Sequence, residues 1–352
     1  MRQFDRIWIM GAIALGTACL MASPARAGYS LYGLGMDVQT GTVANGELHV
    51  QCANNLWSST SGSSSPTNTY TNTFTGFACN DYTQAWLVTT VYGGSNLNTA
   101  KITAAVNGNT IASPIVGNAG GVNDANSNVY GSSVAGVWVL ALPINPSYLH
   151  TDGSQDIVSV VVSDKTTGAT SPFDGRSYYQ TLVTISQSAS LNNTLDYVFA
   201  AGGGDIGQAS GGYLTSRTLD LGAIGSQPIS QADLYATYIY GDSGQKDALL
   251  LNGFSLLGDD VAKKNGTASY PADFIYANMP TSDLLTADNL LKFTVDSADF
   301  PSGSTLESSL RPELAVLGVT HPVPEPGTAA LLAAGVMTLL AWRRTRLGRK
   351  DV

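Results

Sequence analysis

Positively charged residues are scarce in this sequence. The chain of 352 residues holds 17 Lys plus Arg against 26 Asp plus Glu, which gives a formal net charge of −9. Between residues 28 and 326 the imbalance grows, because 9 Lys plus Arg face 24 Asp plus Glu and 9 − 24 = −15. Proteins that bind nucleic acid carry clustered Lys and Arg. The composition therefore excludes nucleic acid as a partner of this region.

Glutamate and histidine are also rare. Only four of the acidic residues are glutamate, and the rest are aspartate, which favours turns and caps over helix interiors. The composition thus leans away from a helical fold. The histidines His49, His150 and His321 stand singly, without zinc-ligand spacing, and the chain has no G-x-S-x-G motif. We therefore predict that the protein is not an enzyme.

The aspartates gather in turns. The close pairs are Asp152 with Asp156, Asp242 with Asp247, and Asp259 with Asp260. Turn aspartates that bond their own backbone explain all three pairs, so we predict no cofactor. Calcium is an alternative, because hard cations take clustered carboxylates, although none of the pairs fits the EF-hand pattern. A glycosidase carboxylate pair is a further alternative, since its spacing is a property of the fold.

Cysteine is limited to three residues, of which Cys19 lies in the N-terminal leader. Cys52 and Cys79 remain, in a chain that the leader directs to an oxidising compartment. A pair with no third thiol is most simply a disulfide there. We predict a Cys52–Cys79 bond that tethers the Ser-, Thr- and Asn-rich segment 54–75 as a long surface loop.

The first 27 residues have the composition of a secretory signal peptide. Arg2 and Arg6 precede an apolar run over residues 7–21, and Ala25-Arg26-Ala27 supplies the small residues that signal peptidase accepts. The run is shorter than the roughly 20 residues of a membrane span. We predict cleavage after Ala27.

Three features follow one another at the C-terminus. Pro324-Glu325-Pro326 keeps the chain extended, and the apolar stretch 329–342 has the length of a short transmembrane helix. A basic cluster then favours the cytoplasmic side of a membrane. The cluster consists of Arg343, Arg344, Arg346, Arg349 and Lys350. This order of motif, span and cluster resembles the PEP-CTERM sorting signal of Gram-negative bacteria.

The resemblance implies a route out of the cell. An exosortase in the inner membrane would recognise the signal and cleave near Pro-Glu-Pro, after transient anchoring by the C-terminal helix. The protein would then pass to the cell surface or the extracellular matrix. A plain membrane anchor is the alternative.

The body between these signals shows strand patterns that repeat. Short runs rich in Val, Ile, Tyr and Thr are bounded by turn residues. Residues 84–95 resemble residues 231–243, and residues 155–164 resemble residues 288–297. Asn-Gly turns are expected at 107–108 and 252–253. We predict a mainly β fold of two tandem, related β-sandwich domains. The pattern resembles tandem jelly-roll-like extracellular domains of unknown function.

The sequence thus predicts four parts. These are a signal peptide at 1–27, a first β-sandwich at 28–190, a second at 191–320 and the sorting signal at 321–352. We expect a non-enzymatic protein that acts in adhesion or in assembly of an exopolysaccharide (biofilm) matrix. The alternative is a carbohydrate-binding protein. Trp57, in the polar loop, is then the candidate for stacking on a sugar, whereas Trp86 and Trp138 lie in apolar strand patterns and are expected in the core.

Overall fold

The computed structural model describes residues 27–31, 34–54, 67–94, 98–117, 121–122, 129–132, 137–166, 173–202, 206–207, 214–223, 228–239, 244–258, 261, 272–306, 310–323 and 335–338. The fold is mainly β, with antiparallel sheets, which confirms the predicted fold class at this level. The predicted signal peptide lies almost entirely outside the described residues.

The strands form four sheets, which we call A to D. Sheet A has the order β1 (Ala27–Leu31), β2 (Leu34–Ala44), β14 (Asn193–Ala201), β21 (Arg311–Pro322), β16 (Gln231–Ile239) and β19 (Ala272–Asn278). Sheet B has the order β10 (Val129–Ser132), β11 (Val137–Pro143), β5 (Asp81–Tyr92), β13 (Arg176–Gln187) and β3 (Gly46–Asn54).

Sheets C and D are the smaller pair. Sheet C has the order β4 (Thr67–Phe74), β12 (Asp156–Asp164), β6 (Thr99–Val106), β8 (Ile115–Gly117) and β9 (Gly121–Val122), and β7 (Asn109–Ala112) pairs with β6. Sheet D has the order β15 (Ser216–Ala223), β20 (Asp288–Thr294), β17 (Ala248–Leu251) and β18 (Phe254–Ser255). Short 3₁₀ helices are η1 (Pro146–Tyr148), η2 (Thr281–Asp283) and η3 (Ser297–Asp299).

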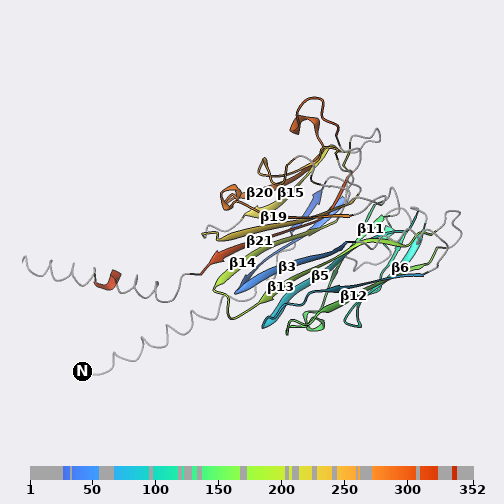
Figure 1. Ribbon diagram of the computed structural model, residues 1–352, viewed down its shortest axis with the longest axis horizontal. Coiled ribbons are helices and arrows are strands. Elements are labelled where there is room, and N and C mark those ends of the chain that lie inside the picture. Colours follow the sequence, from blue (N-terminus) through green and yellow to red (C-terminus); the bar gives the residue numbers. More distant parts are fainter. Residues whose placement is uncertain are drawn as a thin grey trace, which may run out of the picture.

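The sheets stack as layers in the order D, A, B, C (Figure 1). One apolar cluster fills the space between D and A, a second lies between A and B, and a third lies between B and C. The burial patterns of the strands follow from this order. Strands β5, β13 and β21 of the inner sheets are buried on both faces, whereas β6 and β12 of sheet C alternate between buried and more exposed positions.

Aromatic packing joins the two inner sheets. Trp86 on β5 stacks on Phe199 of β14, with ring centroids 4.5 Å apart and an interplanar angle of 13°. Trp138 faces the other way, into the cluster between sheets B and C. Both tryptophans are buried, which confirms their predicted place in the core.

The predicted Asn-Gly turns occur at equivalent places in the two halves. In each, both central residues have positive φ: 48° and 80° at Asn107 and Gly108, and 51° and 86° at Asn252 and Gly253. This is the conformation of a type I′ turn, which matches the twist of the flanking strands. The turns connect β6 to β7 and β17 to β18.

The asparagine side chains of these turns make the same clamp twice. Asn107 donates from Nδ2 to Oδ1 of Asp156 at 2.7 Å, and Asn252 donates from Nδ2 to Oδ1 of Asn289 at 3.0 Å. Each Asn Oδ1 also accepts a backbone N–H from the residue after its partner, at 2.8 and 2.9 Å respectively. The internal repeat of the sequence therefore corresponds to a repeated hydrogen-bond arrangement.

The two N-terminal strands lie in the sheet of the second half. β2 pairs with β14 from Asp37 opposite Ala201 to Ala44 opposite Thr194. The range 28–190 that the sequence predicts for the first domain thus includes strands of sheet A. The sequence pattern could not show this, because it marks strands without saying which strand each one pairs with.

The structure corrects the predicted disulfide, because no bond joins Cys52 to Cys79. Cys52, on β3, packs against the cluster between sheets A and B, whereas Cys79 packs against the cluster between sheets B and C. The two thiols therefore face different layers. Burial raises the pKa of Cys52 to about 12, against a smaller opposing effect of a hydrogen bond with Thr181. Within the loop that the bond was expected to tether, residues 55–66 lie outside the described residues.

Candidate functional site

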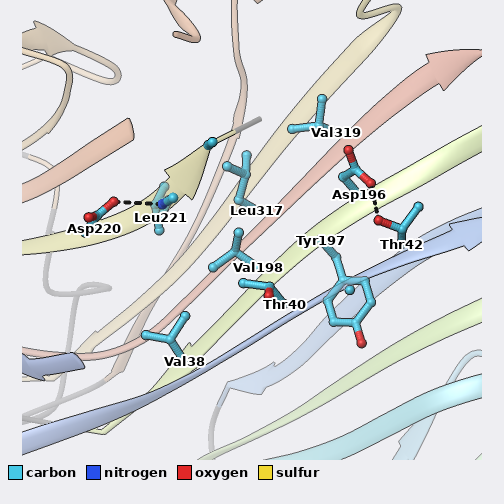
Figure 2. Close-up of a pocket in the computed structure, with 13 residues that line it drawn as sticks. Val38, Thr40, Thr42, Asp196, Tyr197, Val198, Asp220, Leu221, Leu317 and Val319 are labelled. Carbon is cyan, nitrogen blue, oxygen red and sulfur yellow. Dashed lines mark hydrogen bonds between the residues drawn. The ribbon is translucent and has the colours of Figure 1, made fainter. Parts of the chain in front are cut away.

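Two surface hollows stand out in the described part of the chain. The first, which we call the inter-sheet cleft, lies between sheet A and strand β15 of sheet D and has a volume of about 440 Å³. Its lining residues are Val38, Thr40, Gly41, Thr42, Asp196, Tyr197, Val198, Asp220, Leu221, Gly222, Ala223, Leu317 and Val319. Figure 2 shows an apolar stretch of Val38, Val198 and Leu317 with Asp220 and Asp196 on opposite sides.

The carboxylates of the cleft are occupied by the protein itself. Asp196 accepts from the Thr42 hydroxyl at 2.6 Å and contacts Nε2 of His321 at 3.0 Å (Figure 2 shows the first bond). The other His321 nitrogen lies 3.2 Å from the carbonyl of Pro228. Asp220 accepts the backbone N–H of Gly222 at 2.8 Å. The Asp196 contacts join β2, β14 and β21, and the Asp220 bond is local to β15, so the acidic groups of the cleft have a structural role.

The second hollow, which we call the aromatic groove, lies where sheet B ends at β3 and sheet A continues through β16 and β19. Its volume is about 390 Å³. The lining residues are Gly46, Glu47, Leu48, His49, Val50, Phe77, Leu191, Asn193, Leu195, Gln231, Asp233, Tyr235, Tyr276, Gly318 and Thr320. Sheet A thus forms one side and β3, with the segment after β4, forms the other.

Alternation along β16 and β19 places aromatic rings on one face. Tyr235 lies opposite Tyr276 in the antiparallel register, with ring centroids 5.0 Å apart. Phe274 continues the row at 6.0 Å from Tyr235. The residues between them, Leu234 and Ile275, point to the other face and pack between sheets A and D. Tyr276 is 49% exposed, so its ring lies at the surface of the groove.

Asp233 organises the polar end of the row. Its Oδ1 accepts from the Tyr276 hydroxyl at 2.8 Å and from Asn278 Nδ2 at 3.2 Å, and its Oδ2 accepts from Gln231 Nε2 at 2.6 Å. This bond from the hydroxyl to a carboxylate is the main reason that the pKa of Tyr276 is raised. The pKa of Tyr235 rises to about 12, mainly through burial and then through the charge of Asp233. The Tyr276 hydroxyl is therefore held in one orientation.

The opposite wall holds His49. Its ring stacks on Phe77 at 3.7 Å, and its Nε2 lies 3.0 Å from Oγ of Ser186 and 3.7 Å from Oε2 of Glu47. Burial lowers the pKa of His49 to about 4, so the ring is neutral near neutral pH. This is not a catalytic triad, because Ser186 and Glu47 meet the same nitrogen and Ser186 is only 1% exposed.

The other predicted site residues fall in different places. His150 contacts Asp156 at 3.2 Å beside the Asn107 clamp, and Asp152 accepts a turn N–H from Ser154 at 2.9 Å. Within the described ranges, no set of three His, Cys, Asp or Glu could hold a metal ion. Trp57, the motif Pro324-Glu325-Pro326 and the basic cluster from Arg343 to Lys350 lie outside the described residues.

The sequence reading missed the residues of the groove and of the aromatic row that continues beside it. Gln231, Asp233 and Tyr235 lie at every second position of one strand, and Phe274 and Tyr276 do the same on another. That spacing places each set on one face of its strand. The aromatic and polar alternation was a usable signal, but the pairing of the two strands was not visible in it.

The C-terminal segment is the part of the chain that a known protein family matches. Residues 322–346 match the PEP-CTERM protein-sorting motif. This chain carries a PEP-CTERM sorting signal. The motif implies an exported protein that an exosortase processes and that its C-terminus anchors transiently in the membrane, as predicted from the sequence. β21, a central strand of sheet A, ends at Pro322, where the motif begins.

The predicted anchor helix is described only in part. In the described ranges no helix is both long and apolar enough to cross a bilayer. Of the predicted span 329–342, only residues 335–338 are described, and these are helical.

Comparisons of the whole chain give weaker likenesses. No curated protein matches the sequence. A solved peptide-N(4)-(N-acetyl-β-D-glucosaminyl)asparagine amidase has 10% identity and a TM-score of 0.29, covering 78% of this chain and 97% of that one. A recombinant peptide:N-glycanase F has 9% identity and a TM-score of 0.30, with 78% and 96% covered. A glycosyl hydrolase family 2 member from Bacteroides cellulosilyticus has 12% identity and a TM-score of 0.22, with 66% and 24% covered. These likenesses carry no assignment of function.

Proposed function

We propose that the PEP-CTERM protein is a non-enzymatic surface or extracellular-matrix protein that holds exopolysaccharide in its aromatic groove. One observation carries the proposal, the row of Phe274, Tyr235 and Tyr276 beside the hydrogen-bonded group around Asp233. Flat apolar rings next to fixed polar groups suit a sugar, whose ring has C–H faces and a rim of hydroxyls. The export signal supports the proposal, because it directs the body of the protein out of the cell, where exopolysaccharides lie.

The groove is built on rigid elements, which favours binding. Its aromatic side is the face of two paired strands whose opposite face is core, so little order must be gained when a ligand binds. The inter-sheet cleft is a weaker candidate, since Tyr197, the aromatic residue of its lining, is buried at 6% exposed and presents no ring for stacking.

Binding of the full-length chain to soluble glycans, measured by calorimetry, tests the proposal. We expect Tyr276→Ala to weaken binding by about tenfold, since an exposed stacking contact contributes about 1.4 kcal/mol. Phe254→Ala is the matched control, because Phe254 is an aromatic residue on sheet D that is 57% exposed. No binding to any glycan tried, or equal loss in both variants, contradicts the proposal.

Two further measurements test the non-enzymatic role and the role of the sorting signal. Incubation with a bound glycan should release no new reducing ends, and their release would show an enzyme. Deleting residues 323–352 should abolish retention of the protein in the matrix. If the truncated protein has the same location as the full-length chain, the sorting part of the proposal is wrong.

A further inference from the structure

We infer that the aromatic groove selects a glycan with free amino groups, and that it disfavours acidic polysaccharides. This inference rests on the proposed function and names the class of sugar that the same site takes. It starts from the charges of the groove. Glu47 and Asp233 are acidic, and none of its described lining residues is Lys or Arg. His49 does not offset them, because it is neutral above about pH 4.

The hydrogen-bonding groups point to the same class. Asp233 accepts on both oxygens, and Tyr276 and Gln231 are among its donors. The hydroxyl oxygen of Tyr276 and the carbonyl oxygen of Gln231 remain acceptors, and Glu47, 56% exposed, adds a carboxylate. A protonated amine carries three donors and no acceptor, whereas a uronate carboxylate brings only acceptors. The groove therefore complements an ammonium group better than a carboxylate.

The rings add to this preference. Tyr235 and Tyr276 present electron-rich faces, and a cation within about 6 Å of such a face is attracted to it. The charges of Asp233 and Glu47 both act on Tyr235, so the carboxylates and the ring face share one negative field. An amine on a sugar stacked at Tyr276 would lie within this field, because the Tyr235 and Tyr276 centroids are 5.0 Å apart.

Three hexasaccharides with the same β-1,4 linkage test the inference on the full-length chain at mildly acidic pH. They are the glucosamine hexamer, cellohexaose and the mannuronate hexamer, which are cationic, neutral and anionic. We expect the glucosamine hexamer to bind about tenfold more tightly than cellohexaose, and the mannuronate hexamer to bind most weakly. The preference should fall when salt is added, and again when rising pH deprotonates the amines.

Charge variants separate the groove from the acidic body. Glu47→Gln and Asp233→Asn should each reduce the amine preference by roughly threefold. Asp288→Asn makes the same charge change at an exposed position on sheet D and should leave the preference intact. Circular dichroism checks that each variant is folded. Glu47→Gln is the cleaner change, because Asp233 also orients Tyr276.

The outcomes are distinct. Equal binding of all three hexamers overturns the amine inference and leaves the proposed function standing. If none of the three hexamers binds and no other glycan binds either, both the amine inference and the proposed function are overturned. If the amine preference survives Glu47→Gln and Asp233→Asn, it arises from the net charge of the whole body. That result overturns the role of the groove.

Discussion

Replacing Trp86 with alanine tests the packing of sheet A on sheet B. Trp86 is 2% exposed and stacks on Phe199 across this interface. Burying a tryptophan removes about 200 Å² from water, which at about 25 cal/mol per Å² corresponds to about 5 kcal/mol. Measured losses for truncation of a buried Trp are about 3–5 kcal/mol. We expect a loss of that size in the free energy of unfolding.

Urea unfolding followed by far-UV circular dichroism measures this loss. Native domains are stable by only about 5–15 kcal/mol, so the midpoint should fall strongly. Trp86→Phe should recover part of the stability, because a smaller ring can still stack on Phe199. Phe254→Ala, at an exposed site, should change the free energy by no more than about 0.5 kcal/mol. A loss below about 1 kcal/mol for Trp86→Ala would refute the packing of the two inner sheets.

Three other predictions concern pH, thiols and turns. Folding lowers the pKa of His49 from about 6.5 to about 4. The unfolded chain therefore binds the extra proton between these pH values, and up to about 3 kcal/mol of stability present above pH 6.5 is lost as the pH falls towards 4. His49→Gln should flatten this part of the pH profile of urea unfolding. Cys52 and Cys79 should both be alkylated when the purified chain is denatured without reductant, as mass spectrometry would show. Asn107→Ala should destabilise the protein by about 1–3 kcal/mol in the same urea assay, because it leaves Asp156 without this donor and strains a residue at positive φ.

Each of these has an opposing result. An unchanged pH profile in His49→Gln would show that the His49 environment is solvated. A peptide linking Cys52 to Cys79 would show that the thiols meet after all. Asn107→Gly retains the backbone conformation and loses only the side-chain bonds, so equal stability of Asn107→Gly and the parent would show that the clamp with Asp156 contributes nothing.

Local patterns predicted much of the fold. The Val- and Tyr-rich runs predicted strands, and Asn107-Gly108 predicted a type I′ turn, because those preferences act over a few neighbouring residues. The disulfide prediction was wrong because it used only the count of cysteines. Which layer Cys52 and Cys79 face depends on strand alternation and sheet stacking, and neither is encoded in a count.

The sequence by itself determined that this protein is exported and that its fold is mainly β. The sorting motif is read as a short linear segment, so its order of residues suffices to identify it. Only the tertiary structure decided that β1 and β2 join the sheet of the second half, and that Tyr235 and Tyr276 form one aromatic row. These facts depend on pairing between distant strands, where residues far apart in the chain become neighbours through backbone hydrogen bonds and shared burial.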